Sequence, residues 1–404
     1  MTMQDIISLL AALLAIAGIG QALAGWLAVW RFAGDRNLPS GKQPPLTLLK
    51  PLYGDEPLLE AALASVCLQD YPDYQIVFGV QNELDPAIAV VERLQQRFPE
   101  RDITLVVNAA QHGSNRKVSN LINMFQFARH DMLVIADSDL HCAPDYLSRI
   151  VAAFAPTGTG LVTTLYAGLA ANPSLAAQLG ACSINHGLLP GALLSRDLGR
   201  QDCLGATMAL RRSTLQRIGG LHALANHLAD DNVLGQRVRQ LGLRVGIATT
   251  VPATTVPEQR LGALYRHELR WSRTIQSLVP AAFALSSIQF PLFWALLTFG
   301  LSRSPWALLL FLIAWATRAL VSAGIDRTLG LSRAGLATPV NAVLLPLRDI
   351  LSITIILASY LSDTVEWRGQ MMHTRPVEPS ISALPRDLSR DPSRISATQG
   401  TVLS

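Results

Sequence analysis

The sequence predicts an α/β fold, a mostly parallel sheet flanked by helices, attached to several transmembrane helices. Short apolar runs alternate with segments of helical spacing through residues 46–136, as expected for a parallel sheet with right-handed crossovers. Each polar motif of this region falls where a predicted strand ends. Charge-poor apolar stretches near both ends of the chain are long enough to cross a bilayer.

The elements of the α/β region follow one another along the chain. The first strand is an apolar run that stops at Pro51, and the second ends before the polar segment 81–86. The predicted strands are 46–51, 74–80, 103–107, a run ending at 136, 160–165 and 205–210. The predicted helices are 58–68, 87–98, 117–128 and 228–239.

Composition indicates a protein that lies partly in a membrane. Half of the 404 residues are apolar and only 15% are charged, which is little for a soluble protein. The net charge of +4 suits an anionic membrane surface, and no interleaving of aromatic and basic residues favours a nucleic-acid partner. The four cysteines lack metal-type spacing, so we expect reduced thiols.

The N-terminal segment predicts a retained transmembrane helix over residues 1–32. Residues 6–30 contain no charged side chain, and this stretch is too long for the core of a signal peptide. Trp26, Trp30 and Arg31 close it in the manner of an interfacial anchor.

The C-terminal region 278–364 predicts about three membrane segments. Arg318 interrupts the second of these apolar stretches, and Pro346, Arg348 and Asp349 interrupt the last. An adjacent Arg and Asp are costly in lipid, so we expect them to pair or to face protein. The last segment is therefore either a clean span or a broken, re-entrant helix.

Residues 33–257 have ordinary polarity and predict one domain. By the positive-inside rule, basic residues on both sides place this domain in the cytoplasm. Residues 258–277 predict an interfacial amphipathic helix, and the Ser-, Pro-, Arg- and Asp-rich residues 374–404 predict a disordered tail. The flanking basic residues are Arg31, Arg36, Lys42, Arg266, Arg270 and Arg273.

The sequence Asp137-Ser-Asp139 comes directly after an apolar run. Ligand sites in open α/β sheets lie just outside the carboxyl ends of the strands. Two carboxylates there suit Mg²⁺ or Mn²⁺, which also binds a diphosphate. A simple turn is the alternative, because Asp and Ser are common turn residues.

Six short motifs in order resemble glycosyltransferase family 21, the ceramide glucosyltransferases and their bacterial relatives. The resemblance covers about residues 1–370 and implies a GT-A fold and inverting transfer from a UDP-sugar to a lipid hydroxyl. The motifs are Leu48-Leu-Lys-Pro-Leu, Val80-Gln-Asn-Glu-Leu-Asp85-Pro-Ala, Gly113-Ser-Asn-Arg-Lys117, Asp137-Ser-Asp139, Leu228-Ala-Asp-Asp231 and His267-Glu-Leu-Arg270-Trp271.

The resemblance implies that Lys50, Asp85, Lys117 and Asp137 bind the nucleotide-sugar. It also implies that Asp137 and Asp139 bind the divalent metal, although eukaryotic relatives often lack the second aspartate. Asp85 has an alternative use as a helix N-cap before a proline. The alternative for Lys117 is a solvated lysine at the start of a helix, with no role in binding.

Asp231 matches the second acid of the family's Glu-Asp pair. An inverting transfer proceeds in one step and needs one carboxylate to deprotonate the acceptor hydroxyl, and we assign this role to Asp231. Asp230 is its helix-capping neighbour and an acceptor-side candidate. The alternative for both acids is stabilisation of a helix N-terminus by negative charge.

Arg270 and Trp271 match the family's Arg-Trp motif, and His267 stands where the family has Gln or Arg. These three side chains share one face of a helix. Arg270 would bind the departing diphosphate, while Trp271 would wall the sugar or the acceptor. The alternative is that Arg266, Arg270 and Arg273 form the basic stripe of an interfacial helix.

His186 matches a family histidine between the two acidic motifs and is an acceptor-side candidate, with a packed or surface histidine as the alternative. The predicted function is metal-dependent transfer of N-acetylglucosamine from its UDP-sugar to a hopanoid of the bacteriohopanetetrol type. The bacterial branch places this enzyme in an inner membrane, with its catalytic domain in the cytoplasm. Glucosylation of ceramide from UDP-glucose is the alternative, ahead of a processive polysaccharide synthase and of an inactive membrane scaffold.

Overall fold

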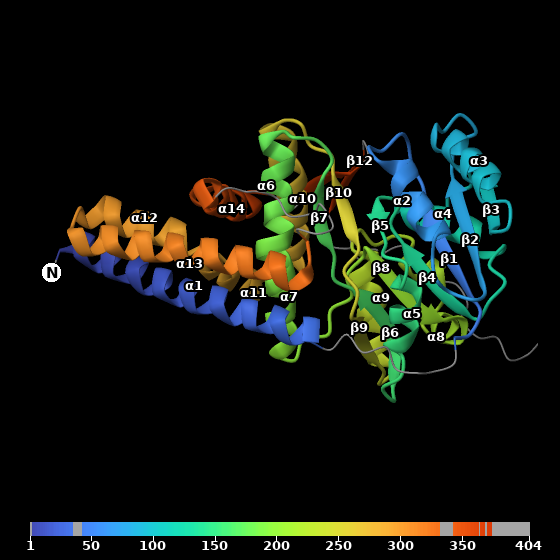
Figure 1. Ribbon diagram of the computed structural model, residues 1–404, viewed down its shortest axis with the longest axis horizontal. Helices are drawn as coiled ribbons and strands as arrows, with labels where there is room; N and C mark the ends of the chain where they lie inside the picture. The colour runs from blue at the N-terminus through green and yellow to red at the C-terminus, as the bar shows by residue number, and fades with distance from the viewer. Residues whose placement is uncertain (1, 35–42, 332–341, 363, 368–369, 374–404) are drawn as a thin grey trace, which may run out of the picture.

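A seven-stranded sheet forms the centre of the α/β part of the protein (Figure 1). The computed structural model describes residues 2–34, 43–331, 342–362, 364–367 and 370–373. The strand order is β3-β2-β1-β4-β8-β6-β9. All neighbouring strands are parallel except β8, which is antiparallel to β4 and to β6. The strands are β1 (Leu46–Pro51), β2 (Tyr74–Val80), β3 (Asp102–Val107), β4 (Met132–Ala136), β6 (Thr159–Thr164), β8 (Thr207–Arg211) and β9 (Arg244–Ala248).

Helices cover both faces of this sheet. One apolar core lies under α2 and α3, and a second lies under α4 and α9. β1, β2 and β4 are buried along their whole length, as apolar runs in a sheet covered on both faces should be. The predicted fold class is thereby confirmed. The helices are α2 (Leu59–Cys67), α3 (Ala87–Arg97), α4 (Arg116–Phe125), α5 (Tyr146–Ala152), α8 (Arg212–Arg217), η2 (Leu221–Leu224) and α9 (Asp230–Gln240).

A second, three-stranded sheet lies between the large sheet and the helical part. Its order is β5-β10-β7, and the sequence did not predict these short strands. A Cβ at Gly168 of β7 would lie 2.7 Å from the Cα of Ala181, so this glycine lets α6 approach the sheet closely. The strands are β5 (Leu140–His141), β7 (Ala167–Ala170) and β10 (Ala253–Val256).

Two helical segments lie between the sheets and the long apolar helices (Figure 1). The first is an almost continuous rod of α6 (Leu175–Ser183), the π-helical turn η1 (Ile184–Leu188) and α7 (Leu189–Asp197), which the sequence did not predict. The second is α10 (Leu261–Leu278), which overlaps the interfacial helix predicted over 258–277 but begins three residues later and ends one residue later. A hairpin of β11 (Thr364–Trp367) and β12 (Gln370–His373) adjoins α10, where Arg273 donates to the Thr364 carbonyl at 2.8 Å.

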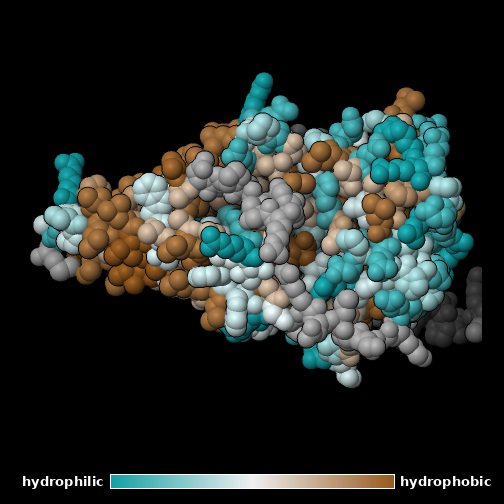
Figure 2. All heavy atoms as spheres, viewed as in Figure 1, coloured by the Kyte–Doolittle hydropathy of each residue, from teal (hydrophilic) through white to brown (hydrophobic). Residues whose placement is uncertain are grey.

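The long apolar helices form an elongated bundle, and Figure 2 shows its hydrophobic surface. Among the described residues, three helices are long and apolar enough to cross a membrane, or four if the segment 280–289 and α12, bent by 68° against each other, form one span. These helices overlap the predicted transmembrane regions 1–32 and 278–364, and the limits of those regions stay predictions. Arg36, Lys42 and the tail 374–404 lie outside the described residues. The bundle contains α1 (Met3–Gly34), α11 (Pro280–Leu285), η3 (Ser286–Gln289), α12 (Pro291–Ser302), α13 (Pro305–Leu329), η4 (Ala342–Leu344) and α14 (Leu345–Ser359).

The charged residues inside the apolar stretches are paired, as predicted. Arg318 of α13 forms an ion pair with Asp349 of α14, with 3.1 Å between Nη2 and Oδ1. Arg348, the neighbour of Asp349, pairs instead with Glu268 of α10. The two adjacent charges of α14 therefore each have a partner on a different helix.

Candidate active site

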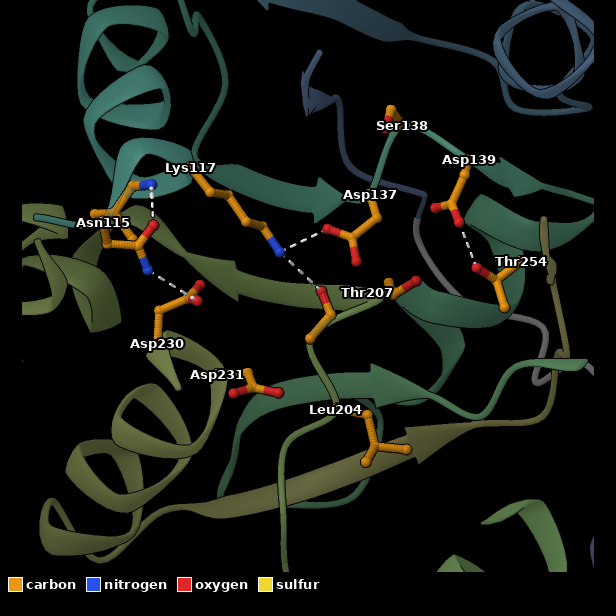
Figure 3. A network of polar contacts seen from close by, with 12 residues as sticks. Asn115, Lys117, Asp137, Ser138, Asp139, Leu204, Thr207, Asp230, Asp231 and Thr254 are labelled. Carbon is orange, nitrogen blue, oxygen red and sulfur yellow. Dashed lines mark hydrogen bonds and ion pairs between the residues drawn. The ribbon is translucent and has the colours of Figure 1, made fainter. Parts of the chain in front are cut away.

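Asp137 and Asp139 lie at the carboxyl end of β4, where the chain leaves the buried strand (Figure 3). Asp137 Oδ1 forms an ion pair with Lys117 Nζ at 2.6 Å. Asp139 Oδ2 accepts a hydrogen bond from Thr254 Oγ1 of β10 at 2.5 Å. The short second sheet therefore holds one carboxylate of the motif, and Lys117 of α4 holds the other.

The middle residue of the motif makes a contact that the sequence did not predict. Ser138 Oγ donates a hydrogen bond to Glu56 Oε2 at 2.5 Å. Glu56 belongs to the loop that follows β1. This loop is therefore tied to the aspartate motif.

The two aspartates fit a divalent cation that receives its other ligands from a substrate. Burial and the charge of Asp137 raise the pKa of Asp139 to about 6, so a nearby cation would stabilise its charged form. No cluster of three or more His, Cys, Asp or Glu side chains that could hold a metal occurs among the described residues. Magnesium sites built from one or two carboxylates and substrate phosphates match this donor set.

Lys117 connects the aspartate motif to a second group of acids. Its Nζ also donates to the Gly205 carbonyl at 3.3 Å, and its side chain is only 15% exposed. The alternative of a solvated lysine is therefore wrong. Burial by itself would lower the pKa of Lys117, but the charges of Asp137 and Asp230 outweigh it and raise that pKa.

Asn115 positions Lys117. It belongs to the motif Gly113-Ser-Asn-Arg-Lys117, but no role was predicted for it. It caps α4, because its Oδ1 accepts from the Val118 amide at 3.1 Å. Its Nδ2 donates to the His227 carbonyl at 2.8 Å and to Asp230 Oδ1 at 3.3 Å. One side chain thus joins the start of α4 to the start of α9.

Asp231 and Asp230 form the first turn of α9. Burial and the charge of Asp230 raise the pKa of Asp231 to about 6, near the range useful for a general base. Asp230 is buried, and its Oδ2 has no hydrogen-bond partner among the described residues. The helix-capping role predicted for Asp230 is wrong, because α9 has no side-chain cap and Asp230 faces Asn115 instead.

Gly205 separates Lys117 from Asp231. Its carbonyl accepts from Lys117, and a Cβ at this position would lie 2.9 Å from Asp231 Oδ2. Any larger residue would displace the carboxylate. Figure 3 shows Lys117, Asp137, Asp230 and Asp231 gathered around this part of the chain.

Asp85 holds the loop after β1. Both of its carboxylate oxygens accept from the Gly54 amide at 3.1 Å, and Oδ1 also accepts from the Ala87 amide at 2.9 Å. Asp85 therefore binds an amide at the start of α3, although the N-cap position itself is occupied by Pro86. Each carboxylate oxygen can accept more than one bond, so this role is compatible with the predicted nucleotide contact.

Lys50 lies in β1 with no exposed surface. Its Nζ has no hydrogen-bond partner among the described residues. Burial lowers the pKa of Lys50, although the charges of Asp139, Asp137 and Glu56 partly oppose this shift. A buried cation beside three acids suits a site that receives an anionic ligand.

His267 and Trp271 of α10 contact each other, as their spacing predicts. Their ring centroids are 4.5 Å apart, with the planes at 72°. His267 Nδ1 lies 2.5 Å from Glu258 Oε1, and this bond lowers the pKa of Glu258 despite its burial. Trp271 packs on the apolar cluster that joins α6, η1 and β10.

Tyr166 is a further residue of this region, and the sequence did not identify it. It packs against the same apolar cluster as Trp271. Burial and the charges of Asp231, Asp137 and Asp139 raise the pKa of Tyr166, so its ring also lies near the three carboxylates. The available sequence signal was its position after the predicted strand 160–165.

His186 lies in the π-helical turn η1. Its Nε2 is 2.8 Å from Asp326 Oδ1, and its Nδ1 is 3.5 Å from Cys182 Sγ. Burial would lower the pKa of His186, but the bond to Asp326 raises it to about 9. His186 is therefore packed in the interior, as the alternative to an acceptor-side role predicted. Its role on the acceptor side stays a prediction.

Comparison with known proteins identifies related sequences. Residues 10–379 match the family described as glycosyl transferase family 21. A ceramide glucosyltransferase of Komagataella phaffii is 33% identical over 126 residues, which are 30% of this chain and 25% of that protein. Ceramide glucosyltransferase 1 of Caenorhabditis elegans is 22% identical over 257 residues, or 62% of this chain and 54% of that protein. The chain thus spans between a quarter and about half of these two relatives.

A solved structure shows the same fold. A mannosyltransferase from Pyrobaculum calidifontis, solved in complex with GDP-Man and Mn²⁺, aligns with a TM-score of 0.51. The alignment covers 88% of this chain and 99% of the mannosyltransferase, at 19% sequence identity. The α/β part is therefore a GT-A-type domain.

Proposed function

Since the chain belongs to glycosyltransferase family 21, we propose that it transfers a sugar from a UDP-sugar to a hydroxyl of a membrane lipid, with inversion at the sugar carbon. One observation supports this proposal most strongly. Lys117 links Asp137, at the end of β4, to the pair of acids that opens α9. The first group suits the diphosphate of a donor, and the second suits proton removal from an acceptor.

The donor would lie over the carboxyl ends of β1 and β4. Asp137 and Asp139 would hold Mg²⁺ or Mn²⁺, which would offset the charge of the departing diphosphate. Lys117 and the buried Lys50 add positive charge on the protein side of this site. Asp85 and the loop tied to it would border the nucleoside.

Asp231 would act as the general base in a single displacement. The acceptor oxygen bonds to the anomeric carbon while the bond between that carbon and the phosphate oxygen breaks. The acceptor proton goes to an oxygen of Asp231, and UDP leaves with the bonding electrons. Burial and the charge of Asp230 keep the pKa of Asp231 raised, so the carboxylate is a competent base near neutral pH.

The residues of α10 would complete the site from the membrane side. Arg270 would bind the departing diphosphate through its planar guanidinium. Trp271 would wall the sugar or the acceptor, and Glu258 holds His267 beside it. His186 and Asp230 remain the acceptor-side candidates.

Two acceptors deserve direct comparison. The relatives named ceramide glucosyltransferases favour ceramide, with UDP-glucose as donor. The resemblance to bacterial family members favours a hopanoid polyol, with UDP-N-acetylglucosamine as donor. In both cases the hydroxyl belongs to a lipid, in agreement with the apolar helices beside the domain.

The test is a product assay with the purified full chain in detergent. Each donor is combined with each acceptor in the presence of Mn²⁺ or Mg²⁺, and the lipids are analysed by mass spectrometry. We expect one glycosylated lipid with wild type and none with Asp231→Asn. Oligosaccharide ladders would favour a polysaccharide synthase instead, and unchanged lipids with every pair would refute lipid transfer.

We also propose that the GT-A domain faces the cytoplasm of a bacterial cell, with the apolar helices in the inner membrane. Support comes from the basic side chains Arg31 and Arg327, which lie near the domain end of α1 and α13. Labelling of a cysteine placed at exposed Leu84 tests this orientation. Labelling by a membrane-impermeant reagent in intact spheroplasts would contradict it.

A further inference from the structure

A basic cavity lies in the α/β part, and it shares no lining residue with the candidate active site. Its volume is about 490 Å³, within the usual range for a ligand pocket. No Asp or Glu belongs to its lining among the described residues. Four arginines from α5, α7, the segment after α7 and β9 line it: Arg149, Arg196, Arg200 and Arg244.

Two of these arginines have carboxylate partners. Arg149 Nε donates to Asp145 Oδ2 at 2.6 Å, and Arg200 donates to both oxygens of Asp202 at 2.7 and 3.0 Å. Four guanidinium charges against two paired carboxylates leave two positive charges around the cavity.

The other two arginines are held by carbonyl groups. Arg196 Nη2 donates to the Val245 carbonyl at 2.6 Å, and Arg244 donates to the Thr157 carbonyl. A carbonyl fixes a guanidinium without neutralising its charge. Burial lowers the pKa of Arg196, although the charge of Asp202 partly opposes this shift.

The cavity lies close to the end of the first apolar helix. Asp197, the neighbour of Arg196, forms an ion pair with Arg31 near the end of α1, at 3.5 Å. The α7 helix packs against α1 and α13 through an apolar cluster that includes Val29, Leu193 and Val321. In Figure 1, α7 lies beside the domain end of α1.

A second crevice extends this basic region towards the apolar bundle. It lies between the ends of α1 and α13 and has a volume of about 660 Å³. Trp30, Arg31 and Arg327 line it. Trp and Arg are the residues that anchor a helix end at the level of the lipid headgroups.

We propose that the arginine cavity binds the phosphate group of an anionic phospholipid. The charge of the cavity selects an anion, and its position beside the end of α1 selects an anion that belongs to the bilayer. No aromatic side chain lines the cavity among the described residues, so nothing there would stack on the base of a nucleotide. The bound lipid would fasten β9 and α7 to the membrane surface, independently of the donor and the acceptor.

The test measures lipid retention by the purified full chain with native mass spectrometry. Phosphatidylglycerol or phosphatidylcholine is added at matched concentrations in detergent. We expect preferential retention of phosphatidylglycerol and about 30-fold weaker retention by Arg196→Gln/Arg244→Gln, the loss typical of two basic side chains leaving an anionic surface. Arg196→Lys/Arg244→Lys should keep most of the binding.

Arg217→Gln is a control that removes one positive charge outside the cavity, because Arg217 is exposed on α8 and lines neither cavity. It should retain the lipid as wild type does. Equal retention of the two lipids, or full retention by Arg196→Gln/Arg244→Gln, would overturn the proposal. Displacement of the lipid by millimolar inorganic phosphate would reassign the cavity to a soluble anion. Circular dichroism confirms that each variant is folded.

Discussion

Arg348 and Glu268 form a two-armed ion pair that joins α14 to α10. The Nη1–Oε1 and Nη2–Oε2 distances are 2.9 and 2.7 Å, and both side chains are nearly buried. Glu268 lies between His267 and Arg270 in sequence, on the helix that carries the proposed leaving-group contacts. The negative charge of Glu268 is therefore balanced by Arg348, which lies on an apolar helix about 80 residues further along the chain.

Breaking this pair should destabilise the protein and displace α10. Loss of one partner from a buried ion pair costs about 3–5 kcal/mol, because the other charge stays buried. We expect Arg348→Gln to lower the melting temperature and the turnover number, with less effect on the donor KM. Thermal unfolding and initial rates measure these effects.

Arg93→Gln is the control for this change. Arg93 and Glu60 form a similar pair at 2.8 Å, but both side chains are about half exposed, so its loss should cost less than about 1 kcal/mol. If Arg348→Gln and Arg93→Gln have equally small effects, the coupling between α14 and α10 is unimportant.

The activity should fall on the acid side with the titration of Asp231. Its carboxylate must be ionised to accept a proton, and its pKa is about 6, so the rate should drop below that pH. Asp230 raises this pKa through like charge. Asp230→Asn should therefore lower the pKa of Asp231 and move the acid limb of the pH–rate profile to lower pH.

The sign of this shift makes the test sharp. A limb that moves to higher pH, or does not move, would show that another group sets it. Asp231→Asn provides the reference, because it should remove nearly all turnover while UDP-sugar binding persists. Binding is measured separately by calorimetry.

Gly205→Ala should displace the carboxylate of Asp231, the proposed base, without adding a group to the donor site. The added methyl group would lie 2.9 Å from Asp231 Oδ2, so the carboxylate must move. A misplaced catalytic group costs about 100-fold in rate. We expect a large loss of turnover with an almost unchanged donor KM, measured by UDP release.

Gly262→Ala is the matched control, because a Cβ there meets only the end of the Arg266 side chain, at 3.7 Å. It should leave turnover near the wild-type value. Equal turnover for Gly205→Ala and wild type would remove the argument that Gly205 fixes the base.

Metal binding should depend on both aspartates of the β4 motif. We expect Asp139→Asn to weaken Mn²⁺ binding in the presence of UDP by at least tenfold, because one of two carboxylate ligands loses its charge. Thr254→Val removes only the hydrogen bond to Asp139 and should have a smaller effect. Electron paramagnetic resonance of free Mn²⁺ measures binding directly, and unchanged binding in Asp139→Asn would refute the assignment.

Lys50→Met should separate stability from donor binding. A buried lysine without a hydrogen-bond partner is costly, so a methionine of similar length should raise the melting temperature. The same change should weaken UDP binding, because it removes a positive charge beside the acids. Weaker folding together with unchanged UDP binding would assign Lys50 to the core alone.

The sequence predicted the strands whose residues are buried on both faces. Both β1 and β2 have the predicted limits, because continuous apolar runs end there at polar or turn-forming residues. Strands such as β5, with only two residues, have no such pattern. The α6–α7 rod escaped prediction because its small and apolar residues show little periodicity.

The sequence predicted the acidic residues of the candidate site but not the residues that hold them in place. Asp137, Asp139 and Asp231 stand in recognisable motifs. Glu56 bonds to Ser138, and Asn115 bonds to Asp230 in addition to capping α4. Both partners lie far away in sequence, so the local sequence does not show these contacts. The capping role of Asp230 failed for the same reason, since a tertiary contact with Asn115 replaced the local one.

The ion pair between Glu268 and Arg348 also limits how this protein can be divided. A chain cut after α10 would keep the whole GT-A core. It would leave Glu268 without its partner Arg348, and His186 without its partner Asp326. Replacing the apolar helices by a foreign anchor would have the same effect. The helical bundle is therefore part of the folding unit of the domain, and not an interchangeable tether.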